Sequence, residues 1–199
     1  MKPDEVAKLS SDQKPEMICL RAASVLKNVV NVSWDKPTGA VSTLDDKENI
    51  NKGNNQEFQI KAPISLEDRN FVKENIFEAL GIAMFTLQNK NIQKEIENIF
   101  YNIVQNEFAE GCWNEVLPKI CGLIQSPDEN WMIIGLRLLQ ELMRAFELSI
   151  DEKGRKVMVS ICEQTYPILE NVLTQIQQSQ SPNQPKIMIS LCKIFLMSN

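Results

Sequence analysis

The segment from residue 89 to residue 148 constrains the fold most, because it predicts three consecutive amphipathic helices joined by short turns. In the first helix, residues 89–108, apolar side chains recur every three or four positions, as on one face of a helix. These side chains are Ile92, Ile96, Ile99, Phe100, Ile103 and Val104. No helix of this kind can bury its apolar face alone. The segment therefore predicts helix pairs that stack as helical repeats.

The second and third helices of this segment are expected over residues 114–124 and 129–146. The apolar stripe of the second is Val116, Leu117, Ile120, Cys121 and Ile124, and that of the third is Trp131, Gly135, Leu138, Leu142 and Phe146. Before the third helix, Ser126 is expected to cap, Pro127 to take the first helical position and Glu129 to complete a capping box. Gly135 inside a helix is disfavoured by about 1 kcal/mol relative to Ala, so it predicts a close contact between helices.

Four more helices are expected outside this segment, over residues 16–34, 67–85, 152–177 and 186–197. Their expected inward-facing side chains are Ile18, Ala22, Val25, Leu26, Val29 and Val30 in the first; Val72, Ile76, Ala79, Leu80 and Ala83 in the second; and Val157, Ile161, Ile168, Leu169, Val172, Leu173 and Ile176 in the third. Ser65 is expected to cap the helix over 67–85, and Pro167 to bend the helix over 152–177. Residues 1–11 are expected to form a short helix or to fray. Residues 35–63 predict a long flexible loop between the helices of one repeat.

The composition indicates a folded, soluble protein. Of 199 residues, 43% are hydrophobic and 24% are charged, which is enough to build a core. No apolar run approaches the roughly 20 residues that cross a bilayer, and the polar start lacks the apolar centre of a signal peptide. A location on the cytosolic or nuclear side is therefore expected.

Enzymatic chemistry is the weakest of three functional hypotheses. The chain has no histidine, so the usual general base at neutral pH is missing, and its scattered glycines form no phosphate-binding loop. Its cysteines are expected to be buried free thiols and not zinc ligands, since no two are spaced as a metal-binding pair. They are Cys19, Cys112, Cys121, Cys162 and Cys192. No catalytic residue, metal or other cofactor is predicted.

The charge balance bears on the kind of partner. A net charge of −5 disfavours nucleic acid, because phosphate binding needs a basic stripe. A protein partner with basic groups is easier to accommodate.

The spacing of the helices predicts an all-α fold, specifically an α-α superhelix of the HEAT or armadillo kind. The expected helix starts recur about every 40 residues or more once the long loop is set aside. The last helix is apolar on nearly all sides, which calls for neighbours on more than one side. We therefore expect residues 1–199 to be a single N-terminal fragment of a longer solenoid.

Short motifs in order along the chain resemble the N-terminal region of importin-beta superfamily nuclear transport receptors, most closely the importin seven/eight subgroup. The motifs are Arg21-Ala22-Ala23, Leu26-Lys27-Asn28 with Trp34, Glu67-Asp68-Arg69, Lys73-Glu74-Asn75-Ile76, residues 108–113, Leu117-Pro118-Lys119-Ile120 and Phe146-Glu147. The chain departs from the family where Glu107-Phe108-Ala109 replaces Asp-Phe-Pro. By this resemblance, part of the first repeat and everything after about the fourth repeat lie outside the chain.

The resemblance implies that outer A helices alternate with inner B helices, and that the B helices bind the GTP form of the small GTPase Ran. The B helices would be residues 67–85, 114–124 and 152–177. Exposed polar residues on them would make the contacts: Arg69, Lys73, Asn114, Lys119, Glu163 and Glu170. Cargo proteins and nucleoporins are further implied partners, and the protein would shuttle between nucleus and cytoplasm.

Simpler interpretations stand beside these. Exposed charge is the default state of an amphipathic helix face, so each proposed contact residue has a plain structural alternative. Trp34, Trp113 and Trp131 are expected to seal the core between repeats. A HEAT-type scaffold unrelated to transport is the second functional hypothesis, because a fold does not fix a function.

Overall fold

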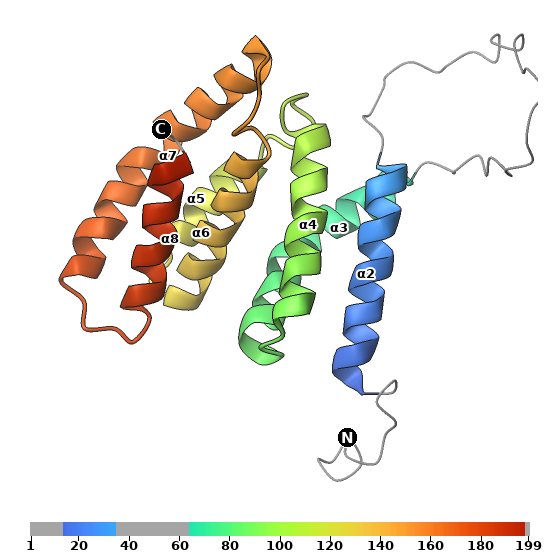
Figure 1. Cartoon of the computed structure of the whole chain (residues 1–199), viewed down its shortest axis with the longest axis horizontal. Coiled ribbons are helices and arrows are strands. Elements are labelled where there is room, and N and C mark those ends of the chain that lie inside the picture. Colours follow the sequence, from blue (N-terminus) through green and yellow to red (C-terminus); the bar gives the residue numbers. More distant parts are fainter. Residues whose placement is uncertain (1–13, 35–63, 198–199) are drawn as a thin grey trace, which may run out of the picture.

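The computed structural model describes residues 14–34 and 64–197, and every regular element within these ranges is helical (Figure 1). The all-α prediction is therefore confirmed. The elements are α2 (Pro15–Ser33), α3 (Leu66–Gly81), the π-helical turn η2 (Ile82–Thr86), α4 (Lys90–Glu107), α5 (Val116–Ile124), α6 (Glu129–Arg144), α7 (Glu152–Gln177) and α8 (Gln184–Met197). The expectations for residues 1–11 and nearly all of residues 35–63 fall outside the described residues.

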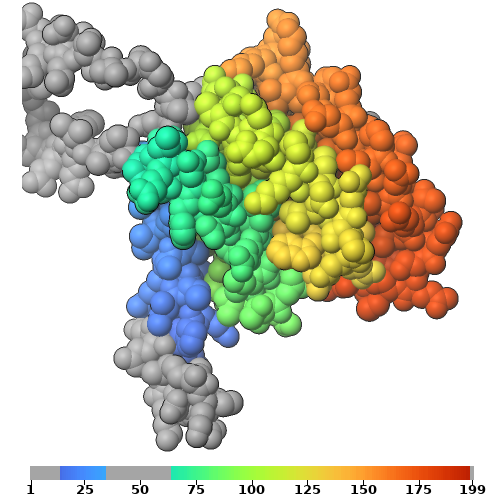
Figure 2. Space-filling view, turned by 180° about the vertical axis from the view of Figure 1, so that it is seen from behind, coloured from blue at the N-terminus to red at the C-terminus, as the bar shows by residue number. Residues whose placement is uncertain are grey.

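The helices form two layers in which successive helices alternate. In the first layer α2 packs on α4, α4 on α6, and α6 on α8. The second layer holds α3, which contacts α4 and α6, and α5, which contacts α6 and α7 (Figures 1 and 2). The predicted A helices thus share one layer and the predicted B helices the other.

The core is centred on α4 and α6, which have neighbours on two sides. All six apolar positions predicted for α4 are buried, from Ile92 to Val104. Leu138 and Leu142 of α6 are fully buried, since their exposed fraction is 0%. Trp34 and Trp113 are each 3% exposed, as expected of residues that seal the core. Trp131 is 37% exposed, so the prediction that it seals the core is wrong; it lies in the first turn of α6 and lines an open groove with Ile82 and Phe85 of η2.

Gly135 allows α5 and α6 to approach closely, as predicted. A Cβ atom at this position would lie 2.8 Å from the backbone nitrogen of Ile124 and 2.9 Å from the Cβ of Leu123. Both distances are shorter than real Cβ contacts allow. The missing side chain is therefore what permits the close packing of α5 against α6.

The start of α6 differs from the prediction. Asp128, and not Ser126, is the N-cap, and its side chain accepts a hydrogen bond of 2.9 Å from the amide of Asn130. Ser126 instead accepts from the amide of Asp128 at 3.2 Å. Glu129 closes no capping box, because its carboxylate accepts hydrogen bonds from Ser181 and Asn183 in the α7–α8 turn. At α3 the predicted cap is confirmed, since Ser65 accepts from the amide of Asp68 at 3.1 Å.

The predicted buried face of α2 is only partly correct. Of the six expected positions Val30 is buried, and Ala22 and Leu26 line an apolar groove with residues of α4, whereas Ile18 is 56% exposed and Val25 is 62% exposed. The side packed on the core carries Leu20, Ala23, Val30 and Trp34. This helix is apolar on two sides and has a single long neighbour, α4, so periodicity alone could not select the packed side.

The cysteine prediction is also wrong in part. The thiols are free, but Cys19, Cys112 and Cys192 are exposed and the other two are half-buried. Cys112 lies in the turn between α4 and α5, and the other four lie on helices at positions that neighbouring helices cover only in part or not at all.

Predictions for α7 and α8 hold more closely. Ile161, Leu169 and Ile176 of α7 are buried, and the helix changes direction along its length, as Pro167 predicts (Figure 1). The last helix, α8, contacts both α6 and α7, while Leu196 on another side is 75% exposed. Among the described residues, no helix combines the length and the hydropathy needed to cross a membrane.

Candidate functional site

A buried carboxylate, Glu107, organises the surface where α3 meets the end of α4. It is the last residue of α4 and only 2% exposed. It falls in register with the apolar stripe, four residues after Ile103 and three after Val104, which places it on the buried side. The sequence alone marks Glu107 only as part of a departure from a family motif. The available signal was an acid at a position where the helical period demands an apolar residue.

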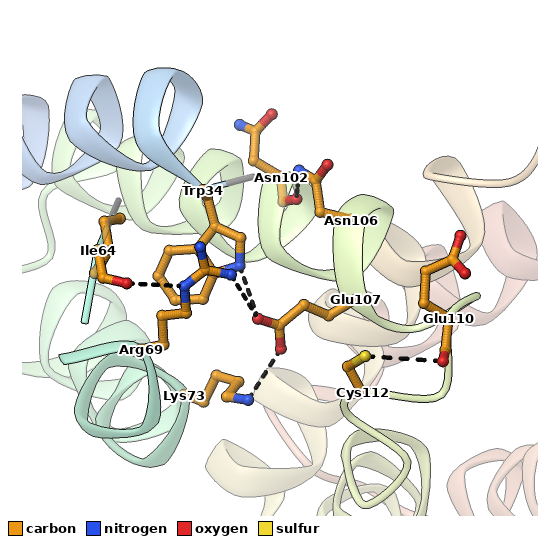
Figure 3. Close-up of polar contacts among 9 residues, drawn as sticks. All are labelled: Trp34, Ile64, Arg69, Lys73, Asn102, Asn106, Glu107, Glu110 and Cys112. Atoms are coloured by element: carbon orange, nitrogen blue, oxygen red, sulfur yellow. Dashed lines mark hydrogen bonds and ion pairs between the residues drawn. The ribbon is translucent and has the colours of Figure 1, made fainter. Parts of the chain in front are cut away.

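Glu107 is satisfied by three groups from two other elements (Figure 3). The indole Nε1 of Trp34 donates to its Oε1 at 3.0 Å, and the Nζ of Lys73 donates to its Oε2 at 2.9 Å. The guanidinium of Arg69 lies 3.6 Å from the same Oε1. The carboxylate thus joins the C-terminal end of α2 to α3 and α4. A buried charge held in this way is compensated by opposite charge and by hydrogen bonds.

Arg69 belongs to the interior and not to the exposed surface. It is 8% exposed, its Nε donates to the carbonyl of Ile64 at 3.3 Å, and its guanidinium carbon lies 5.2 Å from the centre of the Trp34 ring. The expectation that Arg69 is an exposed polar residue is therefore wrong. The reason is the buried Glu107, which draws a cation inward.

Beside this cluster, a groove runs between α3 and α5. Its apolar floor is made by Phe77 and Trp113, whose rings meet edge to face with centres 6.3 Å apart. The Nζ of Lys119 lies 4.1 Å from the centre of the Phe77 ring, and the Nζ of Lys73 lies 5.9 Å from that of Trp113. The groove has a volume of about 240 Å³ and is lined by Asn70, Lys73, Glu74, Phe77, Trp113, Glu115 and Lys119.

The structure brings together only part of the predicted contact set. Lys73 and Lys119 line one groove, although the side chain of Lys73 is only 11% exposed and is held by Glu107. Asn114 is exposed in the turn before α5, next to Trp113. Glu163 and Glu170 are exposed on α7, one helix further along the same layer, and do not line the groove. A role in partner binding stays a prediction for all six residues.

The groove combines charged and aromatic side chains in the way that protein-binding surfaces do. Two ammonium groups and two carboxylates surround an aromatic floor, an arrangement that can hold mixed charges and an apolar side chain. In the parts of the chain that are described, no three His, Cys, Asp or Glu residues are placed to hold a metal ion.

The fold and the groove describe an all-α protein of two alternating helical layers with a polar surface on its second layer. This chain is similar to a probable importin-7 homolog of Dictyostelium discoideum, with 26% identity over 136 residues. The similar region covers 68% of this chain and 12% of the length of that relative. No family model and no solved structure matches the chain. The similarity supports a relationship to importin-type nuclear transport receptors and leaves the subgroup a prediction.

Proposed function

We propose that this chain is part of a nuclear transport receptor of the importin-beta superfamily, most like the importin seven/eight subgroup, and that it works by reversible protein binding. Its partners would be the GTP form of Ran and cargo proteins, with nucleoporins as further partners, and it would shuttle between cytoplasm and nucleus. The observation that carries the proposal is the similarity to the importin-7 homolog together with the alternation of two helical layers. In this proposal the layer of α3, α5 and α7 faces Ran.

The contact residues then have different roles. Asn114 and Lys119 are exposed and would touch Ran directly, and Lys73 would add its charge at the wall of the groove. Arg69 is buried, so it would act only by holding Glu107 and Trp34 in place. Glu163 and Glu170 would extend the contact along α7.

The test compares Ran loaded with a non-hydrolysable GTP analogue with Ran loaded with GDP, each immobilised, with this chain in solution. We expect binding only to the GTP form. Lys119→Glu should weaken that binding by about tenfold or more, as expected for a charge reversed inside an interface. Lys193→Glu is the control, because Lys193 is exposed on α8 in the other layer.

A scaffold role without Ran is the second candidate. It is favoured by the even balance of charge in the groove, where Glu74 and Glu115 offset Lys73 and Lys119. Equal binding of both nucleotide forms, or none, by a folded chain would support the scaffold and refute the Ran proposal.

A further inference from the structure

A second groove lies on the other layer, between α4 and α6, and is independent of the proposed Ran surface. It has a volume of about 420 Å³ and is lined by Lys90, Gln93, Lys94, Glu97, Asn98, Arg137 and Arg144. Four of these seven side chains are cationic and one is acidic. A basic groove stands out on a chain whose net charge is −5.

The acidic groups at this groove are already engaged. Glu97 is 8% exposed and accepts hydrogen bonds from Arg137 Nε at 3.1 Å and from Gln93 at 2.8 Å. Glu141, which lies behind it on α6, is ion-paired with Arg144. The pKa of Glu141 is raised, mainly because the carboxyl is buried. The positive charges of Arg144 and Arg137 lower this pKa and the negative charge of Glu97 raises it, but burial is the largest effect. Neither carboxylate is left to neutralise the lysines.

Lys90 and Lys94 are the free charges of the groove. Both are exposed, they lie one helical turn apart on α4, and neither has an ion-pair partner among residues 14–34 and 64–197. Lys90 is also the first residue of α4, where the helix dipole adds positive potential; the side chain of Asn89 already accepts from the amides of Asn91 and Ile92, so this contribution is small. An anionic ligand is therefore favoured at this end of the groove.

We propose that the α4–α6 groove binds an extended acidic segment of a partner protein. The α4 wall of the groove extends from Lys90 to Asn98, about 12 Å at about 1.5 Å per residue. An extended segment of about four residues spans that length, with carboxylates at alternate positions directed to the same wall. A nucleic acid strand fits less well, because it needs an open aromatic ring for stacking. The ring of Tyr101 is covered by the guanidinium of Arg144, 4.6 Å from its centre.

The test is fluorescence anisotropy with a labelled peptide in which Asp alternates with Ser, an Asn-for-Asp version of it, and a short oligothymidylate. We expect the acidic peptide to bind, the Asn peptide not to bind, and the affinity to fall as salt is added. The double variant K90E/K94E should bind the acidic peptide at least about tenfold more weakly. The control K186E/K193E reverses two exposed lysines of α8 and gives the same net charge. It should bind within about twofold of the unchanged chain.

Three results would overturn the proposal. One is absence of binding to the acidic peptide by the folded chain at low salt. Another is equal weakening by both double variants, because this would mean that only net charge matters. The third is tighter binding of the oligothymidylate than of the peptide, which would make the groove a nucleic acid site. Circular dichroism of each variant establishes that the chain is folded.

Discussion

Removal of the Glu107 carboxylate is expected to destabilise the fold strongly. Glu107→Ala would leave Lys73 and Arg69 without their shared counterion, while the side chains of both remain largely covered, with 11% and 9% exposed. The indole N–H of Trp34 would lose its acceptor as well. Water has little access to these groups and cannot fully replace the carboxylate. The decrease in the free energy of unfolding is therefore expected to exceed that from removal of a surface ion pair.

The magnitude follows from what is left buried. Removal of one partner from a buried ion pair typically destabilises by about 3–5 kcal/mol. Glu107→Gln keeps the volume and one acceptor oxygen for Trp34 but removes the charge, so about 2–3 kcal/mol is expected, in the range for hydrogen bonds to charged groups. Since a domain is stable by only about 5–15 kcal/mol, Glu107→Gln is the safer variant to measure.

The assay is urea unfolding followed by far-UV circular dichroism, from which the free energy of unfolding is obtained. Lys156→Ala is the control, because its ion pair with Glu152 joins side chains that are 75% and 76% exposed. That variant should change stability by about 0.5 kcal/mol or less. If Glu107→Gln also stays within about 0.5 kcal/mol of the unchanged chain, the carboxylate is not buried among these cations and the reasoning is wrong.

Three further predictions concern packing, ionisation and thiols. Gly135→Ala should lower the free energy of unfolding by about 2 kcal/mol through overpacking, whereas Gly122→Ala, with open space around its Cβ position, should raise it by about 0.5–1 kcal/mol; equal effects in urea unfolding would contradict the contact with α5. The raised pKa of Glu141 means that the folded state binds more protons there, so ionisation of this group opposes folding as the pH rises. The free energy of unfolding of Glu141→Gln minus that of the unchanged chain should therefore be larger at pH 7 than at pH 4. If this difference does not increase toward neutral pH, the prediction is wrong. Exposed Cys112 should react with a thiol reagent faster than Cys121, whose pKa is raised by burial, and mass spectrometry of the modified sites would show the opposite order if the exposures were wrong.

The candidate site could be predicted only in part. Lys73 and Lys119 were chosen because a resemblance placed them on inner helices, and the structure does bring them to one groove. The same resemblance predicts an exposed Arg69, but Arg69 is buried because it pairs with Glu107. This counterion lies 38 positions away in sequence, so a local sequence pattern cannot reveal it. The basic α4–α6 groove was missed for a related reason. Its cations come from two helices, and only their packing places them together.

The sequence by itself determined which segments are helical and which side of α4, α5 and α6 is buried. Helical periodicity is a local property, and these helices have one strongly apolar face. The tertiary structure decided the packed side of α2, the burial of Glu97 and Glu107, and the exposure of Trp131. These outcomes depend on which helix lies opposite, since a charge can be buried only where another element supplies its partner, and an apolar side chain stays exposed where no element reaches it.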